Sequence, residues 1–128
     1  MADDTSISVV LADDDQRFRS LVRSVLEEDG YRVVADIGEA DEVGPAVDAA
    51  RPDVVVLDLI MGGADSIETL RDLRERHPRL PVLVISSLFD PLVEQQVVEL
   101  GARYLEKVEG IEALEQAIDA VVSVDRPA

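Results

Sequence analysis

Short apolar runs alternate with longer amphipathic stretches along most of the chain. Runs rich in Val, Leu and Ile predict four buried strands and a weaker fifth, at residues 7–12, 31–37, 53–59, 81–86 and 103–107. Apolar residues with helical spacing follow each run, which predicts an amphipathic helix after every strand. Five such pairs in alternation predict an α/β fold with a parallel sheet and right-handed crossover connections.

The predicted helices differ in how clearly the sequence marks their ends. Asp90 suits an N-cap, Pro91 suits the first helical position, and Gly101 follows the last turn of the fourth helix. In the second helix, Gly44 and Pro45 interrupt the helical spacing, and proline lacks a backbone N–H. We therefore expect the second helix to be short or distorted.

Composition limits the environment and the partners of the chain. Its 28 acidic residues against 12 Lys and Arg give a formal net charge of −16, which disfavours direct binding to nucleic acid or to an anionic membrane. There is no cysteine, no signal-peptide pattern at the start, and no apolar run near the roughly 20 residues that span a bilayer. We expect a cytoplasmic protein whose residues 1–128 form one domain, structured from about residue 7 to about residue 123.

Polar residues with chemical potential lie where the predicted strands end. In open parallel sheets, ligands bind at the carboxyl ends of the strands, so the residues just after each strand are the candidates. These are Asp13, Asp14 and Asp15 after the first strand, Asp58 at the end of the third, Ser86 and Ser87 after the fourth, and Lys107 after the fifth.

This set of side chains points to phosphoryl transfer. Converging carboxylates without Cys or a nearby His suit Mg²⁺ or Mn²⁺, and a cation at Asp13 and Asp14 would relieve their mutual repulsion. An aspartate such as Asp58 can attack phosphorus while the metal neutralises phosphoryl oxygens. Lys107 and the Ser86 hydroxyl supply a point charge and a donor for further oxygens. The constellation predicts a site that places a phosphoryl group on Asp58.

Five segments in this order resemble the receiver domain of two-component response regulators over essentially the whole chain. They are "LADDD" (11–15), "RPDVVVLDLIM" (51–61), "ADSIETLRDLR" (64–74), "PVLVISS" (81–87) and "GARYLEK" (101–107). The resemblance implies a flavodoxin-like (βα)5 fold with a five-stranded parallel sheet in the order 2-1-3-4-5 and helices on both faces. It also implies a phosphoacceptor signalling domain, not an enzyme in its own right.

The resemblance also implies roles for the acidic residues. Asp13 and Asp14 are expected to bind Mg²⁺, directly or through water, together with Asp58. The backbone carbonyl of Ile60 is expected to complete the metal shell. Asp58 is expected to accept the phosphoryl group from a sensor histidine kinase or a phosphotransfer protein.

Three further residues are implied to read the phosphoryl group. Ser86 and Lys107 are expected to contact its oxygens. Tyr104 is expected to change rotamer with Ser86 and so reshape the face of the fourth and fifth helices. That face is expected to signal to an output domain or to a partner protein. Its excess of acidic residues opposes self-association and favours a basic partner.

The chain departs from the family pattern at several positions. Gly62 follows Met61 where the family usually has proline, and Ser66 follows Asp65 where it usually has glycine, so we expect a looser loop. The segment from Gly101 to Tyr104 is one residue shorter than is usual in the family. Val108 replaces the usual proline after Lys107, and we expect a trans peptide there.

Two other positions predict how long the phosphoryl group lasts. In this family the residues two after the phosphoacceptor and two after the conserved hydroxyl flank the path of the attacking water. Here they are Ile60 and Leu88, and neither side chain can orient a water molecule. We therefore expect slow self-dephosphorylation.

Each candidate residue also has an ordinary structural explanation. The run 13–15 could cap the following helix, and Asp15 is expected to do so. Asp58 could be a turn residue, although an acid at a buried strand end is expensive without a partner. Ser87 could replace Ser86 as the donor, and Lys107 could be a surface lysine. His77, the only histidine, is interpreted as an exposed helix end, not as a ligand or phosphoacceptor.

Three alternative functions share parts of this pattern. A phosphohydrolase of the haloacid-dehalogenase type needs a second aspartate two residues after the nucleophile, where this chain has Ile60. A flavodoxin-like flavin protein needs a hydroxyl- and glycine-rich phosphate loop, where this chain has three aspartates. A degenerate receiver, which would bind proteins without phosphate, remains the main alternative because of the altered loop at Gly62 and Ser66.

Overall fold

The computed structural model describes residues 6–61 and 66–125, and its elements follow the predicted alternation. The strands are β1 (Ser8–Ala12), β2 (Arg32–Ile37), β3 (Val54–Asp58), β4 (Val82–Ser86) and β5 (Arg103–Glu106). The helices are α1 (Gln16–Glu28), α2 (Val43–Ala50), α3 (Ser66–Arg76), α4 (Pro91–Glu99) and α5 (Ile111–Asp125). Short 3-10 turns, η1 (Ala40–Glu42) and η2 (Lys107–Glu109), precede α2 and α5.

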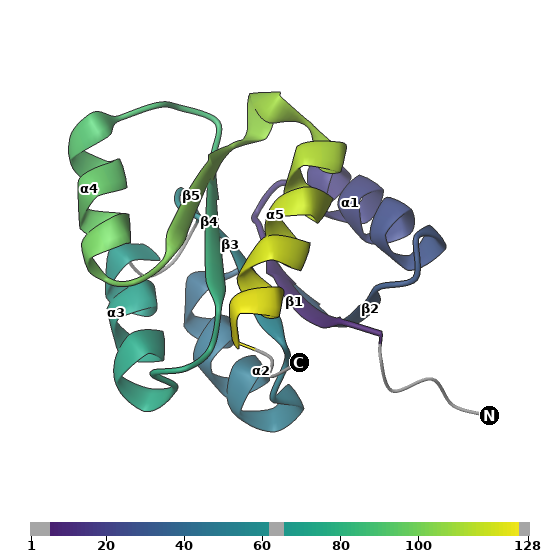
Figure 1. The fold of residues 1–128 in the computed structure, drawn as a ribbon, viewed down its shortest axis with the longest axis horizontal. Coiled ribbons are helices and arrows are strands. Elements are labelled where there is room, and N and C mark those ends of the chain that lie inside the picture. The colour runs from purple at the N-terminus through teal and green to yellow at the C-terminus, as the bar shows by residue number, and fades with distance from the viewer. Residues whose placement is uncertain (1–5, 62–65, 126–128) are drawn as a thin grey trace.

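The five strands form one parallel sheet in the order β2-β1-β3-β4-β5, as predicted (Figure 1). The strands of the site are in register at their carboxyl ends. Ala12 pairs with Leu57 between β1 and β3, and Ser86 pairs with Glu106 between β4 and β5. The residues that follow these strands therefore meet at one edge of the sheet.

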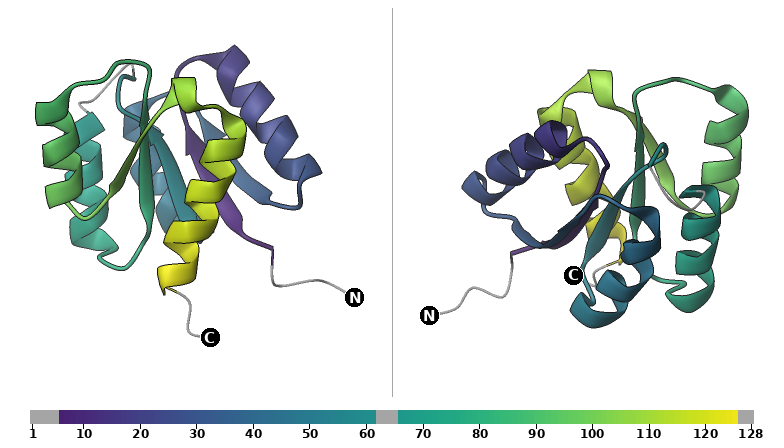
Figure 2. Two further views of the ribbon diagram at one scale, coloured as in Figure 1. Left: turned by 45° about the horizontal axis from the view of Figure 1, so that its top comes forward. Right: turned by 180° about the vertical axis from the view of Figure 1, so that it is seen from behind.

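Helices cover both faces of the sheet, and alternate strand residues face opposite cores (Figure 2). On one face, Val9 and Leu11 of β1 pack in a cluster with buried residues of α1 and α5. On the other face, Val10 and Ala12 pack with buried residues of α2, α3 and α4. All five strand residues of β1, β3 and β4 are buried, as expected for central strands covered on both sides.

The predicted helix boundaries are confirmed where the sequence marks them. The Asp90 carboxylate accepts from the Leu92 N–H, Pro91 begins α4, and Gly101 adopts a φ of +81° after the helix. α2 is short, as predicted, and follows a 3-10 turn. Pro45 does not break it, because this residue lies in the first turn, where backbone N–H groups have no intrahelical acceptor.

Some boundaries and one environment differ from the predictions. Each strand is one or two residues shorter than predicted, and Lys107 begins the turn η2 instead of ending β5. His77 follows α3, but its side chain is partly buried, with 28% of its surface exposed, and its Nε2 lies 2.8 Å from Asp48 Oδ1. The interpretation of His77 as an exposed end is therefore wrong about exposure.

Two further observations concern the backbone and the helices of the described residues. The peptide before Val108 is trans, since none of the peptide bonds in the described ranges is cis. Among residues 6–61 and 66–125, none of the helices is both long enough and apolar enough to cross a bilayer.

Candidate functional site

Asp13 lies at the centre of the acidic edge and is held on several sides. The residue is fully buried directly after β1, and its N–H donates to the Ile37 carbonyl at 2.9 Å. One carboxylate oxygen accepts from the Asp15 N–H at 2.9 Å. Asp15 in turn caps α1 as predicted, accepting from the backbone N–H groups of Arg17 and Phe18. The turn between β1 and α1 thus directs the Asp13 side chain into the sheet edge.

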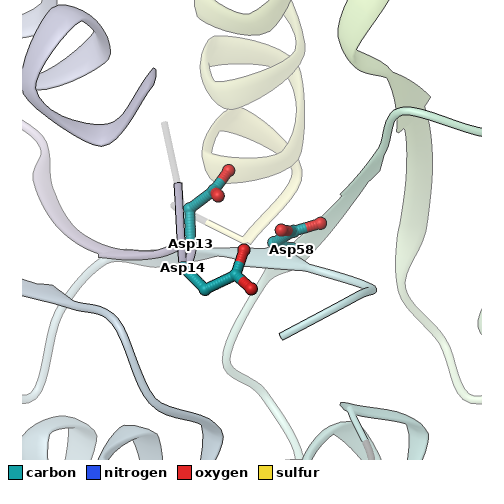
Figure 3. Close-up of side chains that lie close together, drawn as sticks. All are labelled: Asp13, Asp14 and Asp58. Atoms are coloured by element: carbon teal, nitrogen blue, oxygen red, sulfur yellow. The ribbon is translucent and has the colours of Figure 1, made fainter. Parts of the chain in front are cut away.

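Asp58 ends β3 beside Asp13 and is also buried, with 4% of its surface exposed. Its Oδ1 accepts from the Ile60 N–H at 3.2 Å. Asp14 contributes an exposed carboxylate to the same space (Figure 3). Asp13, Asp14 and Asp58 each place an oxygen within 4.8 Å of the others, a spacing at which the three carboxylates could hold a metal ion.

Lys107 supplies the positive charge of the site. Its Nζ lies 2.7 Å from Asp13 Oδ2 and 3.5 Å from Asp58 Oδ2. The ammonium also lies 4.4 Å from the centre of the Phe18 ring, a distance at which a cation is attracted by the ring. Burial lowers the pKa of Lys107, but the hydrogen bond to Asp13 and the charge of Asp58 outweigh it and raise the pKa. The lysine therefore stays charged.

The electrostatics of Asp58 show that one ammonium does not balance the site. Burial, followed by the charge of Asp13, raises the pKa of Asp58 to about 7, although Lys107 and the Ile60 N–H act in the opposite direction. Three carboxylates against a single lysine leave an excess of negative charge. The chemistry of these donors suits a hard divalent cation that binds oxygen.

Ser86 lies at the end of β4 and is almost fully buried, whereas Ser87 is exposed. The Ser86 hydroxyl donates to the Leu88 carbonyl at 2.7 Å and accepts from the Leu88 N–H at 3.1 Å. The Tyr104 hydroxyl donates to the same carbonyl at 2.8 Å. Leu88 therefore connects the two residues through its backbone, a link that no side-chain pattern in the sequence indicates.

Comparison with known proteins places this geometry in a family. The sequence model of the response regulator receiver domain family matches residues 9–119 of this chain. The chain belongs to this family. Such receiver domains are the phosphoacceptor components of two-component response regulators, and some of their relatives carry further domains.

Two relatives show how much of a longer protein the receiver domain covers. The transcriptional regulatory protein DegU of Brevibacillus brevis is 34% identical over 120 residues, which cover 92% of this chain and 51% of the relative. The C4-dicarboxylate transport transcriptional regulatory protein DctD of Pseudomonas aeruginosa is 34% identical over 124 residues, which cover 96% of this chain and 27% of the relative. The chain thus spans about half of the first relative and about a quarter of the second.

Solved structures agree with the fold of the receiver domain. A LuxR-family two-component response regulator from Aurantimonas sp. SI85-9A1 has a TM-score of 0.87 at 29% identity, over 94% of this chain and 88% of that one. The chemotaxis response regulator CheY4 of Vibrio cholerae has a TM-score of 0.81 at 24% identity, over 91% and 98% of the two chains. At that identity the second likeness bears on the fold alone.

Receiver domains generally bind Mg²⁺ at an acidic pocket, and the residues of this receiver domain fit that ion. Asp13, Asp14 and Asp58 are the carboxylates that would hold it. Ile60, two residues after Asp58, donates its N–H to the Asp58 carboxylate. Gly62 and Asp65 of the altered loop lie outside the described residues, whereas Ser66 begins α3 and is buried.

Proposed function

We propose that this receiver domain accepts a phosphoryl group on Asp58 from a sensor histidine kinase or a phosphotransfer protein, in a reaction that requires Mg²⁺ or Mn²⁺. The observation that supports it most is the surroundings of Asp58. A buried carboxylate at the end of β3 lies beside two further aspartates, with the Lys107 ammonium 3.5 Å away. Burying a carboxylate beside like charges costs free energy, and such arrangements are found chiefly at functional sites.

The residues of the site have separate tasks in this reaction. A carboxylate oxygen of Asp58 forms a bond to phosphorus as the bond between phosphorus and the donor nitrogen breaks. Asp13, Asp14, Asp58 and the Ile60 carbonyl would hold the cation, which would supply positive charge to neutralise the phosphoryl oxygens. The Lys107 Nζ lies within 3.5 Å of both Asp13 and Asp58, which supports pairing of its ammonium with an oxygen of the phosphoryl group.

We infer that Ser86 and Tyr104 transmit the change in phosphorylation. The Ser86 hydroxyl donates to the Leu88 carbonyl, which also accepts from Tyr104. If Ser86 turns to donate to a phosphoryl oxygen, the Leu88 carbonyl loses one donor and the β4–α4 segment is free to shift. Tyr104 would follow that segment and alter the face formed by α4 and α5.

The face of α4 and α5 is the proposed contact for an output domain or a partner protein. Exposed acidic residues on these helices, such as Glu99 and Glu112, favour a partner with basic residues. Binding of this kind weakens as salt rises. A net charge of −16 repels anionic phosphates, so we do not expect this chain to bind nucleic acid or membrane directly. We propose a cytoplasmic location, with about residues 7–123 acting as one receiver domain.

Intact mass after incubation with acetyl phosphate and Mg²⁺ tests the proposal. The wild-type protein should gain one phosphoryl group, while Asp58→Asn and a wild-type sample with EDTA should gain none. Gain of the group by Asp58→Asn would place the phosphoacceptor elsewhere. No gain by wild-type protein that is folded and binds Mg²⁺ would contradict the proposal and support the phosphate-independent receiver.

A further inference from the structure

A guanidinium on α1 connects the acidic turn to the neighbouring strand β2. Arg19 donates from Nη1 to the main-chain carbonyl of Asp13 at 2.6 Å. Its Nε donates to Asp36 Oδ1 at 3.1 Å. Only 17% of the Arg19 side chain and 26% of the Asp36 side chain are exposed. The arginine therefore bridges Asp36 of β2 and Asp13, the first residue of the acidic cluster.

Asp36 and its surroundings hold this arginine in place. Burial would raise the pKa of Asp36, but hydrogen bonds from Arg23 and Arg19 outweigh it and lower the pKa, so the carboxylate remains charged. The guanidinium also lies against Gly38, where a Cβ would be 3.1 Å from Nη1. A side chain at position 38 would press on the arginine, so the glycine leaves room for it.

Among the three carboxylates of the acidic cluster, Asp14 has the fewest side-chain contacts, so its position depends most on the backbone. The Asp13 carboxylate has its own partners in the Asp15 N–H and Lys107, and Asp58 has the Ile60 N–H. The exposed Asp14 carboxylate has no hydrogen bond or ion pair to any residue in the ranges 6–61 and 66–125. The peptide that joins Asp13 to Asp14 fixes where the Asp14 side chain begins, and the carbonyl of that peptide is the group that Arg19 holds.

We propose that Arg19, held by Asp36, is a positioning residue that orients Asp14 toward the metal in the proposed function of this site. The proposal rests on metal binding by Asp13, Asp14 and Asp58. A purely electrostatic role predicts the opposite effect, because a positive charge near a cation site opposes binding of the cation. Loss of Arg19 should weaken Mg²⁺ binding if it positions Asp14 and should strengthen it if only its charge matters.

Isothermal titration calorimetry of Mg²⁺ into the whole 128-residue chain distinguishes these roles. Arg19→Gln should weaken binding by about tenfold, within the range typical of residues that orient metal ligands. Arg19→Lys keeps the charge but loses the planar fork, and it should weaken binding similarly. Arg23→Gln is the matched control, because Arg23 also pairs with Asp36 but reaches no atom of Asp13 in the described contacts. Its Mg²⁺ affinity should stay within about twofold of wild type.

A double-mutant cycle separates positioning from general loss of structure. In an Asp14→Asn background, Arg19→Gln should have little further effect on Mg²⁺ affinity, because the ligand that it orients is already lost. Wild-type affinity in Arg19→Gln, or an equal loss with and without Asp14, would overturn the inference while leaving the metal site intact. Absence of Mg²⁺ binding by wild-type protein would instead contradict the metal site itself, and this inference with it.

Discussion

The Tyr104 hydroxyl and the Leu88 carbonyl are joined by a hydrogen bond of 2.8 Å, which ties β5 to the segment between β4 and α4. The same carbonyl accepts from Ser86, so the residue that would sense the phosphoryl group and the residue that would report it share one acceptor. Two donors on one carbonyl make the position of this segment depend on both side chains.

Tyr104→Phe removes one of the two donors to Leu88 and keeps the ring. Loss of a single partly exposed hydrogen bond should reduce the free energy of unfolding by about 0.5–1.5 kcal/mol. Phosphorylation of Asp58, followed by intact mass, should be unchanged, because the hydroxyl is bonded to Leu88 and not to the acidic cluster. Urea unfolding measures the first quantity. A variant that folds normally but is not phosphorylated would show that Tyr104 acts on the site directly.

Lys107→Gln should destabilise the protein, because it leaves Asp13 and Asp58 buried without a counterion. Removing one partner of a buried ion pair typically lowers the free energy of unfolding by about 3–5 kcal/mol, and partial exposure of Lys107 places the loss near the lower end. Mg²⁺ should raise the midpoint of thermal unfolding more in the variant than in wild type.

Arg71→Gln provides a matched control for that measurement. Arg71 pairs with Glu68 on the surface of α3, where both side chains are largely exposed. Loss of this pair should change the free energy of unfolding by less than about 0.5 kcal/mol. Equal losses for the lysine and arginine variants would contradict the view that Lys107 balances buried charge.

Glu115 predicts a dependence of stability on pH. Burial, followed by the charges of the nearby Asp29, Asp119 and Glu112 carboxylates, raises the pKa of Glu115 to about 7. The folded protein therefore binds more protons here than the unfolded chain between the ordinary glutamate pKa and about pH 7. The stabilisation from this group is complete below that window and is lost as the pH rises through it.

Glu115→Gln should remove this contribution, so the variant should lose less stability than wild type between pH 5 and pH 7. Urea unfolding at the two pH values, compared between the proteins, isolates Glu115 because other titrating groups are common to both. The Tyr31 hydroxyl, which donates to Asp119 beside this glutamate, is retained in the variant. Identical changes with pH in both proteins would contradict the shifted pKa.

The side chains of Ile60 and Leu88 predict a long-lived phosphoryl group. Their exposed fractions are 53% and 66%, so polar substitutions there leave both cores undisturbed. Ile60→Asn with Leu88→Glu should speed loss of the phosphoryl group by roughly tenfold or more, since a positioned polar group typically contributes about 10²–10⁴-fold in such steps. Decay measured by intact mass in Mg²⁺ tests this. An unchanged rate would show that water is oriented by other groups.

The sequence determined the order of strands and helices along the chain and the edge of the sheet at which the polar residues meet. Asp13, Asp58 and Lys107 follow strands whose apolar runs are plain in the sequence, and parallel strands bring their carboxyl ends together. Helix ends marked by Asp90 and Gly101 were equally predictable, because a cap and a left-handed turn depend on neighbouring residues alone.

Only the tertiary structure decided how those residues are supported. The Leu88 carbonyl shared by Ser86 and Tyr104, and the Asp13 carbonyl held by Arg19, are main-chain groups, which have no residue-specific signal. The pairing of His77 with Asp48 likewise joins elements distant in sequence. The pKa of Asp58 near 7 follows from burial and from the distance to Asp13, and both quantities arise only when packed helices exclude water from the strand ends.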